Sequence, residues 1–592
     1  MQFSGIPGRL IPRIANVGVI PKPALGRQHL TRFWFDALAF SLVLAFFAYI
    51  SWGMNEISAP LTHLAHTPIS LDVHRLPEYA MRTTLRMLIA VVVSLAFTLT
   101  YATAAAKSRK AGQILIPLLD ILQSVPVLGY ISFTVTGFIA LFPGSMLGVE
   151  CAAIFAIFTS QAWNMAFSLY QSLKTIPHDI DEAAFVFKLS GWQKFWKMEL
   201  PYAMPGLIWN TMMSMSGGWF FVVASEAITV GNQHITLPGV GSYIALAIER
   251  RNLHAIGYAI AAMTVVILLY DQLLFRPLVA WSDKFRYEMT AGGDAPRSWV
   301  LELFTQSRRA KLLLMPFGWL AEWALRLRLF VPKAAPSLQF SPREARLFDY
   351  LWYALLALVG VVTARHLVIF LMASVSLSDA LQVSWLALLT LTRVVVLIAL
   401  ASLVWVPLGI LIGLNHRLAQ MIQPLAQFLA AFPANLLFPV AVMLISRYDL
   451  NPDIWLSPLM ILGTQWYICF NVIAGASAFP NDMREAARNF RVHGWLWWKK
   501  VMVPGVFPYF LTGAITASGG AWNASIVAEA VQWGDKSYTA KGLGAYIAEM
   551  TAAGDFPHIA LGVGAMAIVV VMCNKFFWRP LYDMAARKLR FD

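Results

Sequence analysis

The chain has 592 residues, of which 58% are hydrophobic and only 13% are charged. Soluble proteins carry about twice that charged fraction, and several apolar runs here reach the roughly 20 residues that a helix needs to cross a bilayer. The net charge of +14 does not indicate a nucleic-acid partner, because the lysines and arginines lie between the apolar runs, where they are typical of topology signals. The composition therefore predicts an all-α polytopic membrane protein.

In the first half of the chain, six apolar runs follow a basic amino-terminal segment, residues 1–33. They predict spans at 34–52, 86–105, 114–141, 149–170, 205–230 and 256–278. Positively charged segments stay on the cytoplasmic side, so residues 1–33 and 107–110 are expected there. Counting spans from a cytoplasmic amino terminus places the loop after the fourth span in the cytoplasm as well.

A basic, proline-containing connector, residues 281–345, separates the first half from a second set of apolar runs. Within it, residues 310–330 mix apolar and basic side chains, which predicts an interfacial amphipathic helix. A short additional span is the alternative. The runs after the connector predict spans at 350–372, 394–414, 422–445, 456–473, 507–531 and 559–577.

The second half repeats the first. Trp163 and Trp466 lie 303 residues apart, as do the two prolines Pro177 and Pro480, whereas upstream pairs such as Arg86 and Arg393 lie 307 apart. Such long-range self-similarity indicates duplication. Because each half holds an even number of spans, the sequence predicts about twelve transmembrane helices in two parallel six-helix repeats, residues 34–280 and 346–592, with both termini in the cytoplasm.

One polar stretch occurs in both halves at the same offset. It begins Glu182-Ala183-Ala184, contains Gly191 and reaches Pro201, and it returns as Glu485-Ala486-Ala487 with Gly494 and Pro504. Alanines allow a helix to approach a partner closely, glutamate offers a charge, glycine breaks a helix, and proline is tolerated in the first turn of the next helix. An amphipathic connector with no partner is the alternative, but it does not explain the duplication.

This stretch resembles the EAA loop of the permease subunits of binding-protein-dependent ABC importers. Lys188 and Arg491 stand where that family usually has glycine. The resemblance implies that each loop forms a coupling helix that docks on an ATP-hydrolysing subunit. The ATPase-coupling residues it implies are Glu182, Ala183, Ala184, Gly191, Glu485, Ala486, Ala487 and Gly494.

The resemblance also implies the partners and the location. Two copies of an ABC ATPase subunit, which would use ATP and Mg²⁺, are expected on the cytoplasmic side of a bacterial inner membrane. A periplasmic solute-binding protein would deliver a small-molecule solute, and membrane lipid would surround the chain. The chain itself is expected to hold no cofactor.

Ionisable and strongly polar residues inside spans are expensive in lipid and usually face a cavity or a partner. In the family the translocation path lies between the two halves, and the fifth span is prominent in it. The path candidates are Asp120, Trp219, Glu226, Gln427, Trp522, Asn523 and Glu529. Polar contact between helices is the alternative for each of them, and for Asp120 it is the favoured one.

The sequence offers little for an enzyme. It contains no Gly-x-x-x-x-Gly-Lys-Ser/Thr string, so ATP hydrolysis is expected in a separate subunit. No catalytic residue and no metal site are predicted. The three cysteines, Cys151, Cys469 and Cys573, lie in predicted spans without a pairing pattern and predict no disulfide.

The segment from Ile116 to Pro126 is similar to the nitrate, sulfonate, taurine and bicarbonate branch of these permeases. That likeness implies a small anion as the solute, although Asp120, Glu226 and Glu529 would repel one. Specificity is therefore expected to come from the binding protein. Two other functions stay open: an ABC exporter of a lipid-like substrate, and a secondary transporter driven by an ion gradient.

Overall fold

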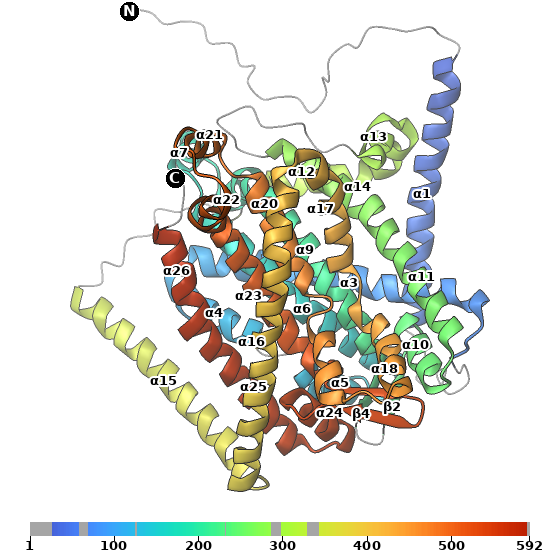
Figure 1. The fold of residues 1–592 in the computed structure, drawn as a ribbon. Helices are drawn as coiled ribbons and strands as arrows, with labels where there is room; N and C mark the ends of the chain where they lie inside the picture. The colour runs from blue at the N-terminus through green and yellow to red at the C-terminus, as the bar shows by residue number, and fades with distance from the viewer. Residues whose placement is uncertain are drawn as a thin grey trace, which may run out of the picture.

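The structure is a computed structural model that describes residues 27–57, 69–124, 127–230, 233–285, 298–327, 329 and 342–588. These parts are helical apart from two short antiparallel ribbons, β1–β2 and β3–β4. Figure 1 shows the arrangement. The prediction of an all-α membrane fold is confirmed.

The first half runs from α1 to α12. Its elements are α1 (Arg27–Ile57), η1 (Val73–Arg75), α3 (Leu76–Lys107), α4 (Arg109–Ser124), α5 (Val127–Leu141), α6 (Met146–Lys174), α7 (His178–Val186), α8 (Gly191–Lys194), η2 (Phe195–Glu199), α9 (Leu200–Glu226), β1 (Ala227–Val230), β2 (Gln233–Thr236), α10 (Val240–Glu249), α11 (Leu253–Tyr270), η3 (Asp271–Phe275) and α12 (Arg276–Ser282). The connector then supplies η4 (Asp283–Phe285), α13 (Trp299–Gln306) and α14 (Arg308–Arg326).

The second half runs from α15 to α26. Its elements are α15 (Pro342–Met372), α16 (Leu377–Leu414), α17 (His416–Ala431), η5 (Ala434–Leu437), α18 (Phe438–Arg447), α19 (Pro452–Trp455), η6 (Ser457–Met460), α20 (Gln465–Ser477), α21 (Asn481–Asn489), α22 (Gly494–Trp497), η7 (Trp498–Met502), α23 (Val503–Ala528), β3 (Ala530–Trp533), β4 (Lys536–Thr539), α24 (Leu543–Ala553), α25 (Phe556–Cys573), η8 (Asn574–Trp578) and α26 (Arg579–Lys588).

The repeat extends to local irregularities. Four π-helical turns occur at matching places, η2 with η7 and η3 with η8. In each case a proline is the second residue after the π-helical turn: Pro201 after η2, Pro504 after η7, Pro277 after η3 and Pro580 after η8. Proline has no N–H and its ring clashes with the carbonyl four residues earlier, so the helix widens at that point instead of keeping its regular hydrogen bond.

Eight helices of the described residues are long and apolar enough to cross a membrane, and the number is ten if each of two bent pairs is one span. The bent pairs, at 79° and 42°, are the third and fourth spans of the second half. The sequence predicted about twelve. Two predicted segments make the difference: 114–141 is divided between α4 and α5, and 205–230 corresponds to α9, whose serines, glycines and Asn210 make it less apolar.

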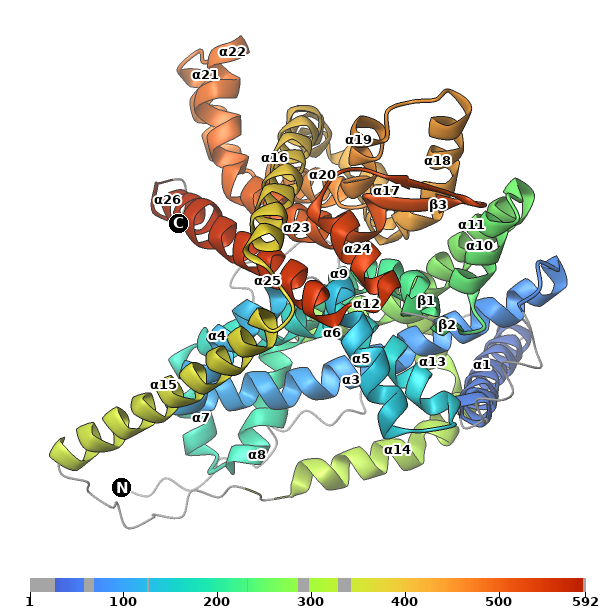
Figure 2. The ribbon, with the colours of Figure 1, turned by 90° about the horizontal axis from the view of Figure 1, so that it is seen from below.

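Within each half a helix trio forms the centre of the packing. In the first half α3 packs on α6 and α6 on α9, and in the second half α16 packs on α20 and α20 on α23. In Figure 2 the two groups lie side by side. The two halves of the chain contact each other where α9 packs on α17 and where α5 packs on α23 and α25.

The two polar loops lie at the same end of the molecule. Figure 1 shows α7 and α21 both at the top, with the β ribbons at the bottom, and Figure 2 shows that the two helices are far apart within that end. This placement is what parallel repeats require, because an inverted repeat would put the loops at opposite ends.

Candidate coupling loops and translocation path

The two polar loops share one backbone design. In the first, the N–H of Lys188 donates to the carbonyl of Phe185 (3.0 Å) and that of Leu189 to the carbonyl of Ala184 (3.1 Å). In the second, Arg491 and Val492 donate to Arg488 and Ala487 (2.9 Å each). This hydrogen-bond pair is the Schellman motif that ends a helix.

The left-handed residue of that motif is not a glycine in either loop. Lys188 has φ 49° and Arg491 has φ 52°. These are the two positions at which the sequence lacks the glycine usual in EAA loops. Lys188 and Arg491 therefore adopt the left-handed conformation themselves, although a residue with a Cβ atom is less stable in it than glycine.

The predicted coupling residues divide by exposure. Glu182 and Glu485 are exposed, whereas Ala184 and Ala487 are buried against the protein, with exposed fractions of 3% and 7%. Ala183 and Ala486 are intermediate, Gly191 is intermediate and Gly494 is exposed. Each short helix thus turns its glutamate outward and packs its second alanine inward.

An ion-pair network ties the first loop to the helix bundle. The ammonium of Lys194 lies 2.8 Å from Asp181 and 3.5 Å from Glu199, and Glu199 lies 2.7 Å from Lys107 at the end of α3. Burial alone would lower the pKa of Lys194, but its contacts with Asp181 and Glu199 outweigh burial and raise that pKa. The sequence did not indicate this network, because Lys107 is distant in the chain and the spacing of Asp181, Lys194 and Glu199 matches no regular pattern.

The connector also reaches the first loop. The indole N–H of Trp192 donates to the carbonyl of Ala324 (2.9 Å), and Gln193 donates to that of Arg326 (3.4 Å). Figure 2 shows α14 extending from α13 to α8. The predicted amphipathic segment is thus a helix, and α14 is not among the helices apolar enough to span a membrane.

Glu226 is the centre of a fully buried cluster. Its carboxylate accepts hydrogen bonds from Arg86 Nη1, Thr83 Oγ1 and the N–H of Gly241, each at 2.7 Å. Arg86 also holds Glu150 through two bonds of 2.6 and 2.7 Å. Glu226 is 0% exposed and Arg86 is 2% exposed, and a buried charge of this kind is tolerated only when it is paired and hydrogen-bonded.

The second half repeats the cluster around Glu529. That carboxylate accepts from Arg393 (3.0 Å), Thr390 (2.9 Å) and the N–H of Gly544 (2.8 Å). Asp453 takes the place of Glu150, at 3.2 Å from Arg393. The arginine here is less buried, with a side chain 15% exposed.

The clusters explain two repeated glycines. A Cβ atom at Gly239 or Gly542 would clash with the carboxylate of Glu226 or Glu529. The segments after β2 and β4 can therefore close over the glutamates only with glycine at these positions. Arg86 and Arg393 were visible in the sequence as a repeated pair, but nothing there showed their partners.

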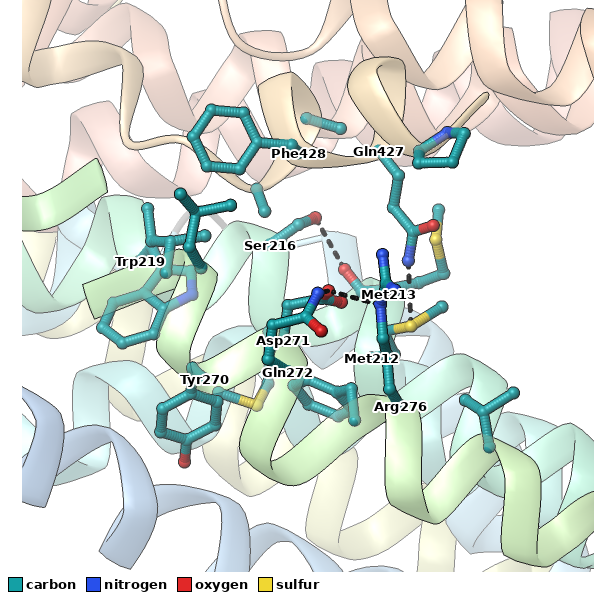
Figure 3. Close-up of a pocket in the computed structure, with 18 of the residues that line it drawn as sticks. Met212, Met213, Ser216, Trp219, Tyr270, Asp271, Gln272, Arg276, Gln427 and Phe428 are labelled. Carbon is teal, nitrogen blue, oxygen red and sulfur yellow. Dashed lines mark hydrogen bonds and ion pairs between the residues drawn. The ribbon is translucent and has the colours of Figure 1, made fainter. Parts of the chain in front are cut away.

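A cavity of about 720 Å³ lies between α9, α11 and η3 of the first half and α17 of the second (Figure 3). Trp219 and Gln427, two of the path candidates, line it together. Gln427 donates to the sulfur of Met212 across the boundary between the halves (2.9 Å). In the same wall Arg276 pairs with Asp271 at 3.2 Å.

Asn523 lines a smaller cavity of about 90 Å³ between α9 and α23. Its side-chain oxygen accepts from the N–H of Val127 (2.8 Å), which joins the halves. Ser216 and Tyr467, which line the same cavity, are hydrogen-bonded to each other across that boundary.

The remaining path candidates lie elsewhere. Glu226 and Glu529 sit in the buried clusters, and Trp522 is buried in the core with 2% exposed. None of the three lines either cavity. Asp120 belongs to α4, but its side chain lies outside the described part of the structure. For Glu226 and Glu529, the contacts fit the alternative of polar contact between helices.

The family described as "Binding-protein-dependent transport system inner membrane component" matches residues 82–276 and again residues 405–590, together more than half of the chain. The chain belongs to this family. Both matches fall inside the predicted halves 34–280 and 346–592. The resemblance of the duplicated loop is therefore confirmed at the level of the family, with two permease domains in one chain.

Curated relatives are permeases from several organisms. The chain is 32% identical over 150 residues to the bicarbonate transport system permease protein CmpB of Synechococcus elongatus, covering 25% of this chain and 52% of that one. It is 26% identical over 190 residues to the nitrate import permease protein NrtB of Leptolyngbya laminosa, covering 32% and 64%. The chain thus matches about half to two thirds of the length of these relatives.

A more distant match is the glycine betaine/proline betaine transport system permease protein ProW of Escherichia coli. The chain is 24% identical to it over 228 residues, covering 38% of this chain and 60% of ProW. Its solute differs from those in the names of CmpB and NrtB. Likeness within this family of permeases therefore does not fix the solute.

The buried clusters generate a stability prediction for the permease. Arg86→Met removes the cation that pairs two buried carboxylates, and such a loss costs about 3–5 kcal/mol. We expect a clearly lower melting temperature in detergent, measured by the thermal unfolding of the purified protein.

Arg393→Met is the matched control. Because Arg393 and Asp453 are partly exposed, water replaces part of the lost pairing, and we expect a smaller decrease. Equal decreases for the two variants would contradict the assignment of the first cluster as the tighter one.

Proposed function

We propose that the protein is the complete membrane permease of an ATP-driven importer of a small anion, with both halves of the usual pair supplied by one chain. The observation that carries this proposal is the duplicated coupling loop. Both copies lie at one end of a permease-family fold, and each presents an exposed glutamate, Glu182 or Glu485. The proposed setting is a bacterial inner membrane, with both termini and both loops in the cytoplasm.

Each loop is connected directly to a helix that lies at the boundary between the halves, α9 for the first loop and α23 for the second. After α8 the chain continues through the π-helical turn η2 into α9, and after α22 it continues through η7 into α23. Two copies of an ABC ATPase, which use ATP and Mg²⁺, would bind the loops. A displacement of either loop would then be passed along α9 or α23 to the cavities.

The boundary between the halves is the proposed translocation path. It contains cavities lined by Trp219, Gln427 and Asn523, and in the described part of the chain the halves are joined there by single hydrogen bonds. Such a boundary can open when ATP binding and hydrolysis move the halves between inward-facing and outward-facing states. A periplasmic binding protein would release solute into the gap.

The solute class is proposed from the relatives, two of which carry bicarbonate and nitrate in their names. Among the described residues that line the two cavities, Arg276 is the cation, and Asp271 pairs with it. The path therefore offers an anion little unbalanced positive charge. We assign selectivity to the binding protein for that reason.

A pulldown of the tagged chain from its native membrane in mild detergent, followed by mass spectrometry, tests the proposal. An ATPase together with a periplasmic solute-binding protein supports an importer. An ATPase alone would favour export of a lipid-like substrate, and neither partner would favour a secondary transporter.

The coupling role predicts the behaviour of a double variant. Glu182→Lys with Glu485→Lys reverses the exposed charge on both loops, and we expect it to abolish substrate-stimulated ATP hydrolysis by the assembled complex without unfolding the permease. Glu302→Lys with Asp583→Lys makes the same charge change at exposed positions on α13 and α26, and it should retain stimulation. If both double variants retain it, the glutamates have no role in coupling.

If Asn523 lines the path and Glu529 only stabilises its half, their alanine variants should affect different properties: solute transport for Asn523 and thermal stability for Glu529. Asn523→Ala removes one hydrogen bond between the halves, worth about 0.5–1.5 kcal/mol, so transport in proteoliposomes should change by up to about tenfold while the melting temperature stays near that of the wild type. Glu529→Ala should lower the melting temperature first, because it leaves Arg393 without its buried partner. If Glu529→Ala changed transport without lowering the melting temperature, and Asn523→Ala lowered the melting temperature instead, Glu529 would be the path residue and Asn523 the stabilising one.

A further inference from the structure

The two coupling loops, residues 178–194 (loop 1) and 481–497 (loop 2), have the same backbone but different surfaces. Where loop 1 carries Phe185 and Val186, loop 2 carries Arg488 and Asn489. The apolar pair is 85% and 73% exposed, and Arg488 and Asn489 are exposed as well. Any partner that covers both tips meets an apolar surface at one and a cationic surface at the other.

Two of the charged residues of loop 1, Asp181 and Lys194, are paired within the permease, whereas Asp179, Glu182 and Lys188 are exposed. Asp181 and Lys194 form an ion pair, and Lys194 and Lys107 both reach Glu199. At the positions of Asp181, Lys194 and Glu199, loop 2 and the turn after it carry Arg484, Trp497 and Met502. The network thus has no counterpart at these positions of the second half.

Further exposed cations lie in loop 2 and directly after it. Arg491 in its turn and Lys499 and Lys500 in η7 are exposed. Arg484 is directed to the protein, where it donates to the carbonyl of Ala476 (3.0 Å). These cations outnumber the exposed Asp482 and Glu485, so the outward face around loop 2 has a net positive charge.

The connector makes the loops differ in a third way. Trp192 of loop 1 is held by the carbonyl of Ala324 and, through its backbone N–H, by that of Leu329 (3.3 Å). Its counterpart Trp495 in loop 2 is 79% exposed. Loop 1 is supported by α14 and offers its apolar tip, whereas loop 2 offers a tryptophan in addition to its cations.

We propose that the two loops bind their ATPase subunits by different forces. Loop 1 buries Phe185 and Val186 in an apolar groove, and loop 2 pairs Arg488 and Arg491 with acidic side chains of the ATPase. This inference rests on the proposed function, since it assumes that both loops dock on ATPases. It adds that the two docking sites are chemically unequal.

Salt separates the two forces. The screening length is about 10 Å at 0.1 M salt and falls to about 3 Å at 1 M, so exposed charge pairs weaken as salt rises. Burial of apolar side chains does not weaken under these conditions. Contact at loop 2 should therefore weaken strongly as salt rises, and contact at loop 1, where the apolar tip is buried, should weaken much less.

Phe187 and Phe490 offer a matched pair of probe positions. They are the same residue at the same offset, and they are 72% and 81% exposed. A photoreactive phenylalanine analogue at either position, in the full permease purified with its ATPase, reports local contact as crosslink yield. Between about 0.05 and 1 M NaCl we expect the yield at position 490 to fall several-fold and the yield at position 187 to change by less than about twofold.

Exchange of the tips tests the cause. Arg488→Phe with Asn489→Val places the residues of loop 1 on loop 2 and should reduce the salt dependence at position 490, with Arg491 still in place. Phe185→Arg with Val186→Asn should introduce it at position 187. Equal salt dependence at the two positions, or a dependence that the exchange leaves unchanged, would overturn the inference while the proposed coupling stands. If neither position crosslinks to the ATPase at any salt concentration, both the inference and the proposed coupling fail.

Discussion

In each half, a buried carboxylate holds together segments that are distant in sequence. Glu226 is the last residue of α9, and Glu529 directly follows α23. Each accepts hydrogen bonds from a threonine and an arginine on α3 or α16 and from a backbone N–H beyond a β ribbon. A carboxylate without solvent is stable only with such partners. The helix pairs, the ribbons and the helices α10 and α24 are therefore fixed relative to one another around these two groups.

With each half fixed in this way, relative motion is expected at the boundary between the halves. The buried ion pairs described above lie inside each half, whereas the ion pair of Arg251 with Asp535 between the halves is exposed. At the cavities the polar contacts between the halves are single hydrogen bonds that involve Asn523, Gln427, Ser216 and Asn435. Two rigid bodies joined by weaker contacts are suited to a motion in which the halves rock against each other. The π-helical turns η2 and η7 lie between the loops and the long helices α9 and α23, where each loop joins its half.

Duplication preserved the backbone of the two loops but not their surfaces. The Schellman turns, the π-helical turns and the outward glutamates match, whereas the loop tips and the ion pairs behind them differ. In a pair of identical subunits the two docking sites are equal by symmetry. In a fused chain each site can change independently, and the connector helix α14 contacts the loop of the first half.

The sequence by itself determined the membrane class, the duplication, the family and the positions of the loops, because hydropathy, repeat spacing and a local motif are all properties of neighbouring or regularly spaced residues. Of the residues it proposed for the path, Trp219, Gln427 and Asn523 line cavities between the halves, whereas Glu226, Trp522 and Glu529 do not. It did not reveal that Glu226 and Glu529 are enclosed by Arg86 and Arg393, that Lys188 and Arg491 make the turn of the missing glycines, or that α14 supports Trp192. Only the tertiary structure decided these points, since each depends on which distant groups come within hydrogen-bonding distance, and spacing along the chain does not encode that distance.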